Sequence, residues 1–309
     1  MNNHTAERLK ELQALPLERK VGFSIARIVE FHNMTGGKCY VSYSGGKDST
    51  VLLHLCRELY PDIPAVFCNT GLEYPEVVEF VKQQNNITII RPDKTFKEVL
   101  EQQGYPVISK EVSQTVYKAR MGQKDAIAKL DGTRIDKKTG KISQYNIPKY
   151  KYLLNAPFKI SHRCCDELKK KPFHKYEKET GNSPIIGTMA QEGALRRINW
   201  IRYGCNSFDG DRKSSAPLSF WTERDILRFL LWKNIPIPSV YGTIEWSRES
   251  IWLTGVKRTG CIFCPIGLHH DGPTDRFHKL EQSHPALYKY CMNSIGLKPV
   301  IEYLRGKKI

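Results

Sequence analysis

Residues 39–59 have the sequence CYVSYSGGKDSTVLLHLCREL, in which three structural signals follow one another. The first five residues, 39–43, are β-prone and largely apolar, which predicts a short strand. The hexapeptide SGGKDS at 44–49 contains two adjacent glycines, which predict a tight turn. Residues 50–59 are strongly helix-forming. A strand, a glycine turn and a helix in this order are typical of a loop that binds phosphate.

The residue types of this turn suit a nucleotide phosphate. The two glycines have no Cβ, so the main chain can turn sharply and approach an anion closely. Free amides at the start of the helix would hold the phosphate oxygens, the serines would add hydroxyl donors, and Asp48 would orient the loop or hold Mg²⁺ through water. The spacing fits neither GxxxxGK[ST] nor GxGxxG, and an ordinary capped Gly-Gly turn is the alternative. We expect cofactor contacts from Ser44, Gly45, Gly46, Lys47, Asp48 and Ser49.

Strand and helix signals alternate beyond this stretch. Further strands are predicted at 64–68, 87–90 and 184–187, and helices at 75–84 and 223–232, the latter with Thr222 as its N-cap. The alternation predicts an α/β fold with a doubly wound, mostly parallel sheet, which binds ligands beyond the carboxyl ends of its strands. Two amphipathic helices, broken near Pro16, are expected over residues 5–33.

The chain is strongly basic. It has 309 residues, with 48 Lys and Arg against 32 Asp and Glu, a net charge of +16 that attracts polyanions. Between residues 118 and 151, ten basic residues face three acidic ones, and Asp136–Gly140 is typical of a hairpin turn. We predict a helical segment at 1–36, a nucleotide-binding domain at 37–245 with a basic insertion rather than a core element at about 113–160, and a helical region that bears the CxxC at 246–309. The basic surface is expected to suit RNA or DNA, although such a surface is often only solvated.

Four of the nine cysteines form pairs, whereas the others are scattered singly. Cys164 and Cys165 are adjacent, and Cys261 and Cys264 form a CxxC. Four thiolates suit a [4Fe–4S] cluster or Zn²⁺. Adjacent cysteines are unusual for zinc, and burial as small apolar residues is a further alternative. Nearby basic residues would offset the charge of a cluster, or would simply form a solvated face: His162, Arg163, Lys169, Lys170, Lys171, Lys257 and Arg258. The predicted metal ligands are Cys164, Cys165, Cys261 and Cys264.

The hexapeptide is the signature of the PP-loop, or adenine nucleotide alpha hydrolase-like, superfamily. Within it the chain resembles the phosphoadenosine phosphosulfate (PAPS) reductase family from about residue 38 to residue 284. Residues 69–76, NTGLEYPE, resemble that family's Asp-Thr-Gly…Pro-Glu loop, with Asn69 in place of Asp. Residues 187–196 resemble its second loop, in which Arg196 matches and Met189 and Gly193 depart. Residues 217–241 resemble its Pro-Leu…Trp-Thr-Glu…Ile-Pro…Tyr stretch.

The resemblance implies roles for these loops. Residues Asn69, Thr70, Gly71, Gly187 and Met189 would flank adenine and ribose. Arg196 would pair with a distal phosphate or sulfate and act in catalysis with Asp48, although a solvated surface arginine is the alternative. Adjacent cysteines upstream of a CxxC are similar to the pattern of sulfonucleotide reductases that carry a [4Fe–4S] cluster.

The expected function follows from what matches and what is missing. Sulfonucleotide reductases carry a C-terminal Glu-Cys-Gly-Leu/Ile-His motif, and residues 303–309, YLRGKKI, contain no cysteine. We therefore expect an ATP-dependent enzyme that cleaves between the α and β phosphates and transfers an adenylyl group or sulfur. A sulfonucleotide reductase using another thiol and a non-catalytic accessory that binds nucleotide and nucleic acid are the alternatives. A cytoplasmic location is expected, no membrane contact is expected, and a homodimer is compatible with the sequence.

Overall fold

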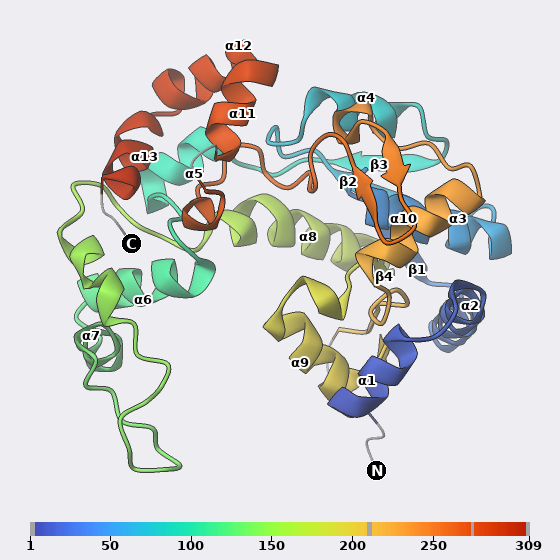
Figure 1. Cartoon of the computed structure of the whole chain (residues 1–309), viewed down its shortest axis with the longest axis horizontal. Coiled ribbons are helices and arrows are strands. Elements are labelled where there is room, and N and C mark those ends of the chain that lie inside the picture. The colour runs from blue at the N-terminus through green and yellow to red at the C-terminus, as the bar shows by residue number, and fades with distance from the viewer. Residues whose placement is uncertain (1–3, 209–211, 273–274, 307–309) are drawn as a thin grey trace. The chain divides into compact units, whose positions relative to one another are not determined.

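The computed structural model describes residues 4–208, 212–272 and 275–306 and contains two compact units. Unit 1 comprises residues 1–69, 73–91 and 172–259, and unit 2 comprises residues 70–72, 92–171 and 260–309. This division in space cuts across the boundaries expected at 36/37 and 245/246, which remain predictions. Figure 1 shows the order of the elements along the chain. No helix among the described residues is long and apolar enough to cross a membrane.

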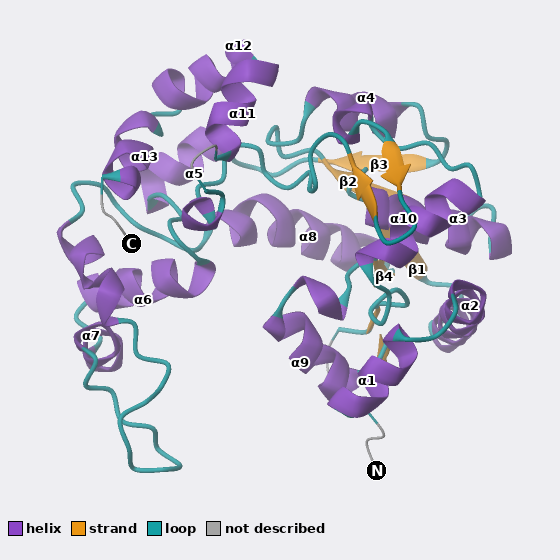
Figure 2. Ribbon diagram, in the orientation of Figure 1, coloured by secondary structure: helices purple, strands orange, loops and turns teal. Residues whose placement is uncertain are grey.

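Unit 1 is built on a six-stranded sheet with the strand order β3-β2-β1-β4-β6-β5. Figure 2 shows strands β1 to β4 of this sheet in orange. Four neighbouring strands are parallel, and β1 lies between β2 and β4, where Val41 pairs with both Ala65 and Ile185. Strand β6 continues the parallel arrangement and β5 pairs with it antiparallel. The predicted α/β fold with a mostly parallel sheet is confirmed. The strands are β1 (Cys39–Ser42), β2 (Ala65–Cys68), β3 (Ile87–Ile90), β4 (Ser183–Ile186), β5 (Asn206–Ser207) and β6 (Ser214–Ser215).

The helices of unit 1 bury one apolar face each. In α3, for example, Val51, Leu52 and Leu55 have no exposed surface, as expected for a helix packed on a parallel sheet. The break predicted near Pro16 separates α1 from α2, and Thr222 caps α10 through a hydrogen bond from the Asp225 amide. The elements are α1 (Ala6–Gln13), α2 (Leu17–Met34), α3 (Lys47–Leu59), α4 (Pro75–Lys82), α8 (Lys171–Thr180), α9 (Ala194–Tyr203), α10 (Glu223–Trp232) and the hairpin β7 (Ile244–Trp246) with β8 (Ile251–Leu253).

A buried ion pair joins α2 to α10. The Lys20 Nζ atom lies 2.6 Å from Asp225 Oδ2, and both side chains are less than one-tenth exposed. Asp225 also accepts hydrogen bonds from the amide and hydroxyl of Thr222, and Lys20 donates to the Gln13 carbonyl. The N-terminal helices are therefore an integral part of unit 1.

Unit 2 is mainly helical. Two of its helices, α6 and α7, fall in the predicted basic insertion, where the sequence analysis expected no core element. Val116, Leu130 and Leu153 of this segment are fully buried, so it contributes to the apolar interior of unit 2. The elements are α5 (Phe96–Gln103), α6 (Lys110–Arg120), α7 (Lys124–Asp131), a 3₁₀ helix (Pro148–Asn155), a π-helical turn (Asp166–Lys170), α11 (Arg276–Ser283), α12 (Pro285–Lys289), a second π-helical turn (Tyr290–Ser294) and α13 (Lys298–Arg305).

Candidate functional site

The glycine loop joins β1 to α3 in unit 1 and has a backbone that requires glycine. Gly45 adopts a φ of +70°, and a Cβ there would lie 2.6 Å from Val81 Cγ2 and 2.8 Å from Val77 Cγ1. Gly46 is the N-cap of α3 and offers no side chain to the first amides of that helix. The first N–H groups of a helix lack intrahelical acceptors, so the start of α3 offers main-chain donors to an anion, apart from the Lys47 amide, which donates to a tyrosine hydroxyl.

Hydroxyl groups hold the loop in this shape. Ser49 Oγ donates to the Gly46 carbonyl at 2.9 Å, and Thr50 Oγ1 donates to the same carbonyl at 3.0 Å. The Ser44 amide donates to Ser49 Oγ at 3.2 Å, and the two serine hydroxyls lie 3.0 Å apart. Ser49 therefore forms hydrogen bonds to Ser44 and to Gly46 and stabilises the turn. Ser44 itself is exposed.

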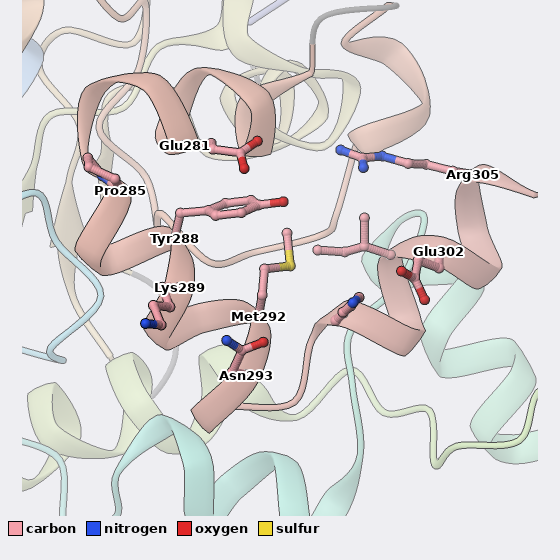
Figure 3. A pocket seen from close by; sticks show the side chains of 10 residues that line it. Glu281, Pro285, Tyr288, Lys289, Met292, Asn293, Glu302 and Arg305 are labelled. Carbon is pink, nitrogen blue, oxygen red and sulfur yellow. The ribbon is translucent and has the colours of Figure 1, made fainter.

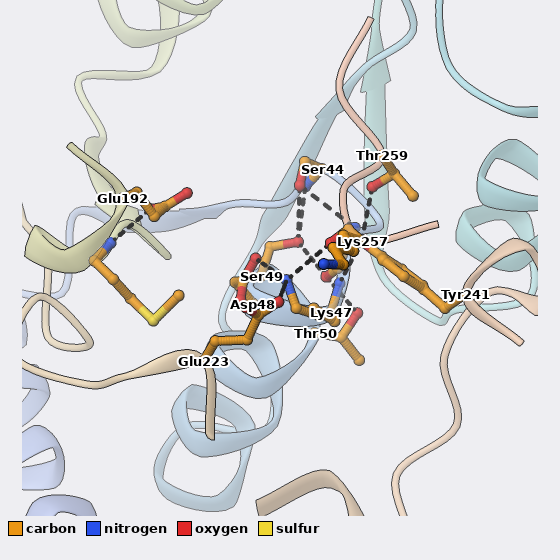
Figure 4. A network of polar contacts seen from close by, with 12 residues as sticks. Ser44, Lys47, Asp48, Ser49, Thr50, Glu192, Glu223, Tyr241, Lys257 and Thr259 are labelled. Carbon is orange, nitrogen blue, oxygen red and sulfur yellow. Dashed lines mark hydrogen bonds and ion pairs between the residues drawn. The ribbon is translucent and has the colours of Figure 1, made fainter. Parts of the chain in front are cut away.

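Charged side chains converge at the first turn of α3 (Figure 4). The buried Lys47 Nζ lies 3.3 Å from Asp48 Oδ2 and 3.5 Å from Glu223 Oε1. Burial raises the pKa of Asp48, the Lys47 charge lowers it, and Glu223 raises it again. Asp48 Oδ1 is buried and has no hydrogen-bond partner among the described residues. A buried carboxylate oxygen that lacks a hydrogen-bond donor suits a cation, and Mg²⁺ takes oxygen ligands.

Tyr241 and Thr259 support the loop from distant parts of the sequence. The Lys47 amide donates to the Tyr241 hydroxyl at 3.2 Å, and that hydroxyl lies 2.8 Å from Thr259 Oγ1. A Cβ on Gly46 would lie 3.1 Å from each of these two oxygens. Tyr241 was expected only as part of the family's sequence pattern, and Thr259 was not predicted as a partner of the loop. No local signal identifies Thr259, because the contact depends on the fold.

The end of β4 approaches the same helix start. A Cβ on Gly187 would lie 3.2 Å from the Asp48 carbonyl oxygen and from Ser49 Cα, so a larger residue would push against α3. Met189 is buried, and its amide donates to Glu192 Oε2 at 2.8 Å. The structure therefore brings Gly187, one of the predicted residues, next to the start of α3.

Arg196 lies within electrostatic reach of this region. Burial lowers its pKa, the Arg258 guanidinium lowers it further, and Asp48 raises it. Arg196 also forms an ion pair with Glu192. A second guanidinium close enough to lower the pKa of Arg196 favours an anion between or beside the two groups, because a guanidinium binds phosphate or sulfate with two parallel donors. Arg258 was predicted among the charges near the cysteines, which remains a prediction, and its charge acts on Arg196 within unit 1.

Asn69 follows β2 at the carboxyl edge of the sheet, where its amide donates to the Ile90 carbonyl at 2.9 Å. The carboxyl ends of β1, β2 and β4 share this edge, so Asn69 lies on the ligand-binding side expected for such a sheet. Thr70 and Gly71 belong to unit 2, where the Leu72 amide donates to Thr70 Oγ1 at 3.3 Å and Gly71 has a φ of +74°. The adenine and ribose contacts expected of all three remain predictions.

All four paired cysteines belong to unit 2. Burial raises the pKa of Cys164, and the thiols of the other three raise it further. Burial also raises the pKa of Cys264 to about 11, as do the thiols of Cys261 and Cys165 to a smaller extent. Each of these mutual effects requires proximity, so residues about 100 positions apart in the sequence have been brought together.

Positive charges accompany these thiols. The Lys169 ammonium lowers the pKa of Cys164, and Cys165 contributes to the raised pKa of Lys170, whose largest cause is a hydrogen bond to Asp166. The Arg276 charge lowers the pKa of Cys264, and its Nη1 donates to the Cys264 carbonyl at 3.3 Å. Both lysines were predicted from the sequence to lie near the thiols. Arg276, which lies 12 residues beyond the CxxC, was not.

The four thiols fit a metal centre by their chemistry. Sulfur donors suit iron–sulfur clusters and zinc, and the adjoining cations would stabilise their thiolates. No group of three or more His, Cys, Asp or Glu residues among those described is arranged closely enough to coordinate an ion. The proximity of the cysteines is therefore an observation, and metal coordination remains a prediction.

A pocket of about 370 Å³ lies among α11, α12 and α13 of unit 2 (Figure 3). Tyr288, Met292 and Ile301 supply its apolar lining, and Lys289 and Arg305 contribute charges. The Arg305 guanidinium already donates to Asp275 Oδ2 at 2.6 Å. None of the predicted site residues lines this pocket.

Residues 38–143 match the model of the phosphoadenosine phosphosulfate reductase domain. Among curated proteins, an uncharacterised protein of Methanocaldococcus jannaschii is 35% identical over 98 residues, which cover 29% of this chain and 23% of that protein. Sulfate adenylyltransferase subunit 2 of Alkalilimnicola ehrlichii is 25% identical over 248 residues, which cover 78% of this chain and 69% of that protein. The chain thus spans under a quarter of the first relative's length and about two thirds of the second's.

Solved structures resemble the chain more distantly. PAPS reductase from Candida auris in a phosphate complex is 13% identical with a TM-score of 0.39, and the match covers 80% of this chain and 97% of that one. The U34-tRNA thiolase NcsA from Methanococcus maripaludis with its [4Fe-4S] cluster is 13% identical with a TM-score of 0.34, covering 92% of this chain and 80% of that one.

Proposed function

Because residues 38–143 match the phosphoadenosine phosphosulfate reductase domain, we propose that the chain is an ATP-dependent enzyme of that family, which cleaves the nucleotide between its α and β phosphates. The observation that carries the proposal is the glycine loop: Gly45 and Gly46 leave the start of α3 open to an anion, beside the charges of Lys47 and Asp48. We further propose that the protein acts in the cytoplasm.

In this proposal the chain's own residues bind and orient the nucleotide. The amides at the start of α3 hold phosphate oxygens, and Arg196 with Arg258 neutralises charge on the phosphates as it develops. An oxygen of the acceptor bonds to the α-phosphorus while the bond from that phosphorus to the bridging oxygen breaks, and pyrophosphate leaves. A sulfur or nitrogen nucleophile then bonds to the acceptor carbon that carries the adenylated oxygen, the carbon–oxygen bond breaks, and AMP leaves with that oxygen.

Asp48 is the residue proposed to hold Mg²⁺. Its buried Oδ1 needs a partner, and its Oδ2 is shared with Lys47. Because burial raises the pKa of this carboxyl, a cation that stabilises the carboxylate would offset the cost of keeping it charged. Glu223, which also pairs with Lys47, helps to fix the position of the lysine ammonium.

The four cysteines of unit 2 are proposed to hold a [4Fe–4S] cluster, with Zn²⁺ as the alternative. Cys164, Cys165, Cys261 and Cys264 would be the ligands. A bound cluster would supply a site that carries or activates sulfur. Lys169, Lys170 and Arg276 would offset its negative charge.

Reduction of a sulfonucleotide is the second candidate, favoured by one observation. Arg196 and Arg258 lie close enough to influence each other, and such a pair suits a substrate with a further phosphate or sulfate group. This reaction would require a thiol from elsewhere in the chain or from another protein.

Product analysis separates the two candidates. The purified protein is incubated with Mg²⁺ and ATP, or with PAPS or adenylyl sulfate and a thiol donor, and its products are resolved by chromatography. The proposal predicts AMP and pyrophosphate from ATP, and a rate about 100-fold lower for Asp48→Asn. The exposed Asp62→Asn, also in unit 1, is the matched control and should retain the wild-type rate. Release of sulfite without turnover of ATP would support the second candidate and refute the first.

A further inference from the structure

A lysine-rich hairpin follows α7 in unit 2. Its two arms meet at the antiparallel bridge between Ile135 and Ile142, and the Ser143 amide donates to the Arg134 carbonyl at 2.8 Å. The Asp136 amide donates to the Lys141 carbonyl at the same distance. We call residues 134–145 the basic hairpin, and Figure 1 shows it, in green, extending from the end of α7.

Hydrogen bonds give the basic hairpin a defined shape. Asp136 Oδ1 accepts the amides of Lys138 at 2.8 Å and Thr139 at 3.0 Å, and these bonds lower the pKa of the carboxyl. At the base, Asn146 Nδ2 donates to the carbonyls of Gly132 and Arg134. The turn is therefore built from specific contacts, and its one acidic side chain faces the backbone amides of the turn.

Three lysines of the basic hairpin have no carboxylate partner among the described residues. Arg134 pairs with Asp125 at 2.9 Å, and both Lys129 and Lys151 have carboxylate partners within 2.8 Å. In contrast, the exposed Lys137, Lys138 and Lys141 form no ion pair with any described residue. These three ammonium groups lie on one turn and are available to anions of a partner, as are those of Lys118, Lys124 and Lys149, which also form no ion pair with a described residue.

Large apolar side chains lie beside these lysines. Ile135, Ile142 and Tyr145 are 59%, 72% and 61% exposed. Exposed apolar side chains on an ordered hairpin favour a contact surface over a merely solvated turn, because their burial in a complex is favourable.

We propose that the basic hairpin binds a nucleic acid. Three lysines on a two-stranded ribbon match the regular phosphates of a polynucleotide, and such a ribbon fits a nucleic-acid groove. The tyrosine ring offers a stacking surface to a base, and the isoleucines can pack against sugars or base edges. The net charge of +16 gives the chain a long-range attraction to the same partner. Calling this nucleic acid the acceptor of the proposed reaction rests on the proposed function, whereas the binding itself does not.

Binding is tested by fluorescence anisotropy with a labelled RNA stem–loop and a labelled DNA duplex, which distinguish the two polymers. The triple variant Lys137→Glu, Lys138→Glu and Lys141→Glu is compared with a control that changes the net charge equally, Lys10→Glu, Lys38→Glu and Lys178→Glu, all exposed in unit 1. Three phosphate contacts on duplex DNA correspond to about a fortyfold loss of affinity between 50 and 200 mM salt. The wild type and the control should show this dependence, and the hairpin variant should lose it.

A second variant tests the apolar part. Tyr145→Ala should weaken binding by about 5- to 150-fold if the ring stacks on a base. Equal affinities for the hairpin variant and its control would overturn the proposal, as would binding of the wild type to anionic lipid vesicles but to neither polymer. Pyrophosphate release from ATP, measured in parallel, separates a failure of this surface from a failure of the proposed reaction.

Discussion

Replacing Gly45 by Ala tests the glycine loop most sharply, because two costs combine at that position. A residue with a Cβ at a φ of +70° pays about 1–2 kcal/mol for the left-handed backbone. The new methyl group would lie 2.6 Å from Val81 Cγ2 and 2.8 Å from Val77 Cγ1, and such overpacking costs about 1–3 kcal/mol. The total expected loss is about 2–5 kcal/mol.

A matched control isolates the clash. Gly36 has a φ of +59° in the same unit, and a Cβ there would meet nothing within 4 Å. Gly36→Ala should therefore pay only the backbone cost of about 1–2 kcal/mol and should bind ATP like the wild type. Urea unfolding measures the stability of both variants, and isothermal titration measures their affinity for ATP.

The cost of Gly45→Ala can appear either in the free energy of unfolding or in the affinity for ATP. If the loop keeps its shape, the free energy of unfolding falls by the full amount; if the loop shifts to relieve the contact with Val77 and Val81, ATP affinity falls instead. A Gly45→Ala protein that equals Gly36→Ala in both stability and ATP affinity would refute this reasoning.

Three further outcomes are expected. Asp225→Asn leaves the Lys20 ammonium buried without its counter-charge, so urea unfolding should show a loss of about 3–5 kcal/mol; a loss below 1 kcal/mol would mean that water reaches the lysine. Arg196→Lys removes the two-pronged guanidinium donor, so ATP affinity measured by titration should fall about tenfold without loss of stability. Unchanged affinity would mean that Arg196 is a solvated surface residue without a role in binding. In metal-free protein, burial favours the neutral Cys264 thiol, so its alkylation by iodoacetamide, followed by mass spectrometry, should accelerate as pH rises toward about 11. An alkylation rate that levels off near pH 9 would contradict the raised pKa of Cys264.

The elements with strong local signals were predictable. The strand, turn and helix at residues 39–59 follow from residue types that are adjacent in the chain, and the Thr222 cap follows from the hydroxyl that precedes the helix. The helices α6 and α7 were not predicted, because the high density of lysine and arginine there was interpreted as an insertion. Their apolar positions, such as Val116 and Leu130, have helical spacing that the charge count concealed.

The surroundings of the glycine loop were beyond local sequence patterns. Tyr241 lies 194 residues from Lys47, and its hydroxyl becomes a partner of the loop only when the fold brings the two together. Glu223 and Arg258 reach the site in the same way, and each alone looks like a solvated surface charge. The cysteines were an exception, since paired spacing of a rare residue type is informative before any fold is known.

The location of the nucleotide phosphates is the most direct test of the account. A crystal structure of the protein with Mg²⁺ and a non-hydrolysable ATP analogue should place phosphate oxygens within hydrogen-bonding distance of the main-chain amides between Gly46 and Ser49, with Asp48 facing the metal ion. A complex in which the analogue occupies another place and leaves these amides to solvent would contradict it, as would calorimetric titration that detects no ATP binding.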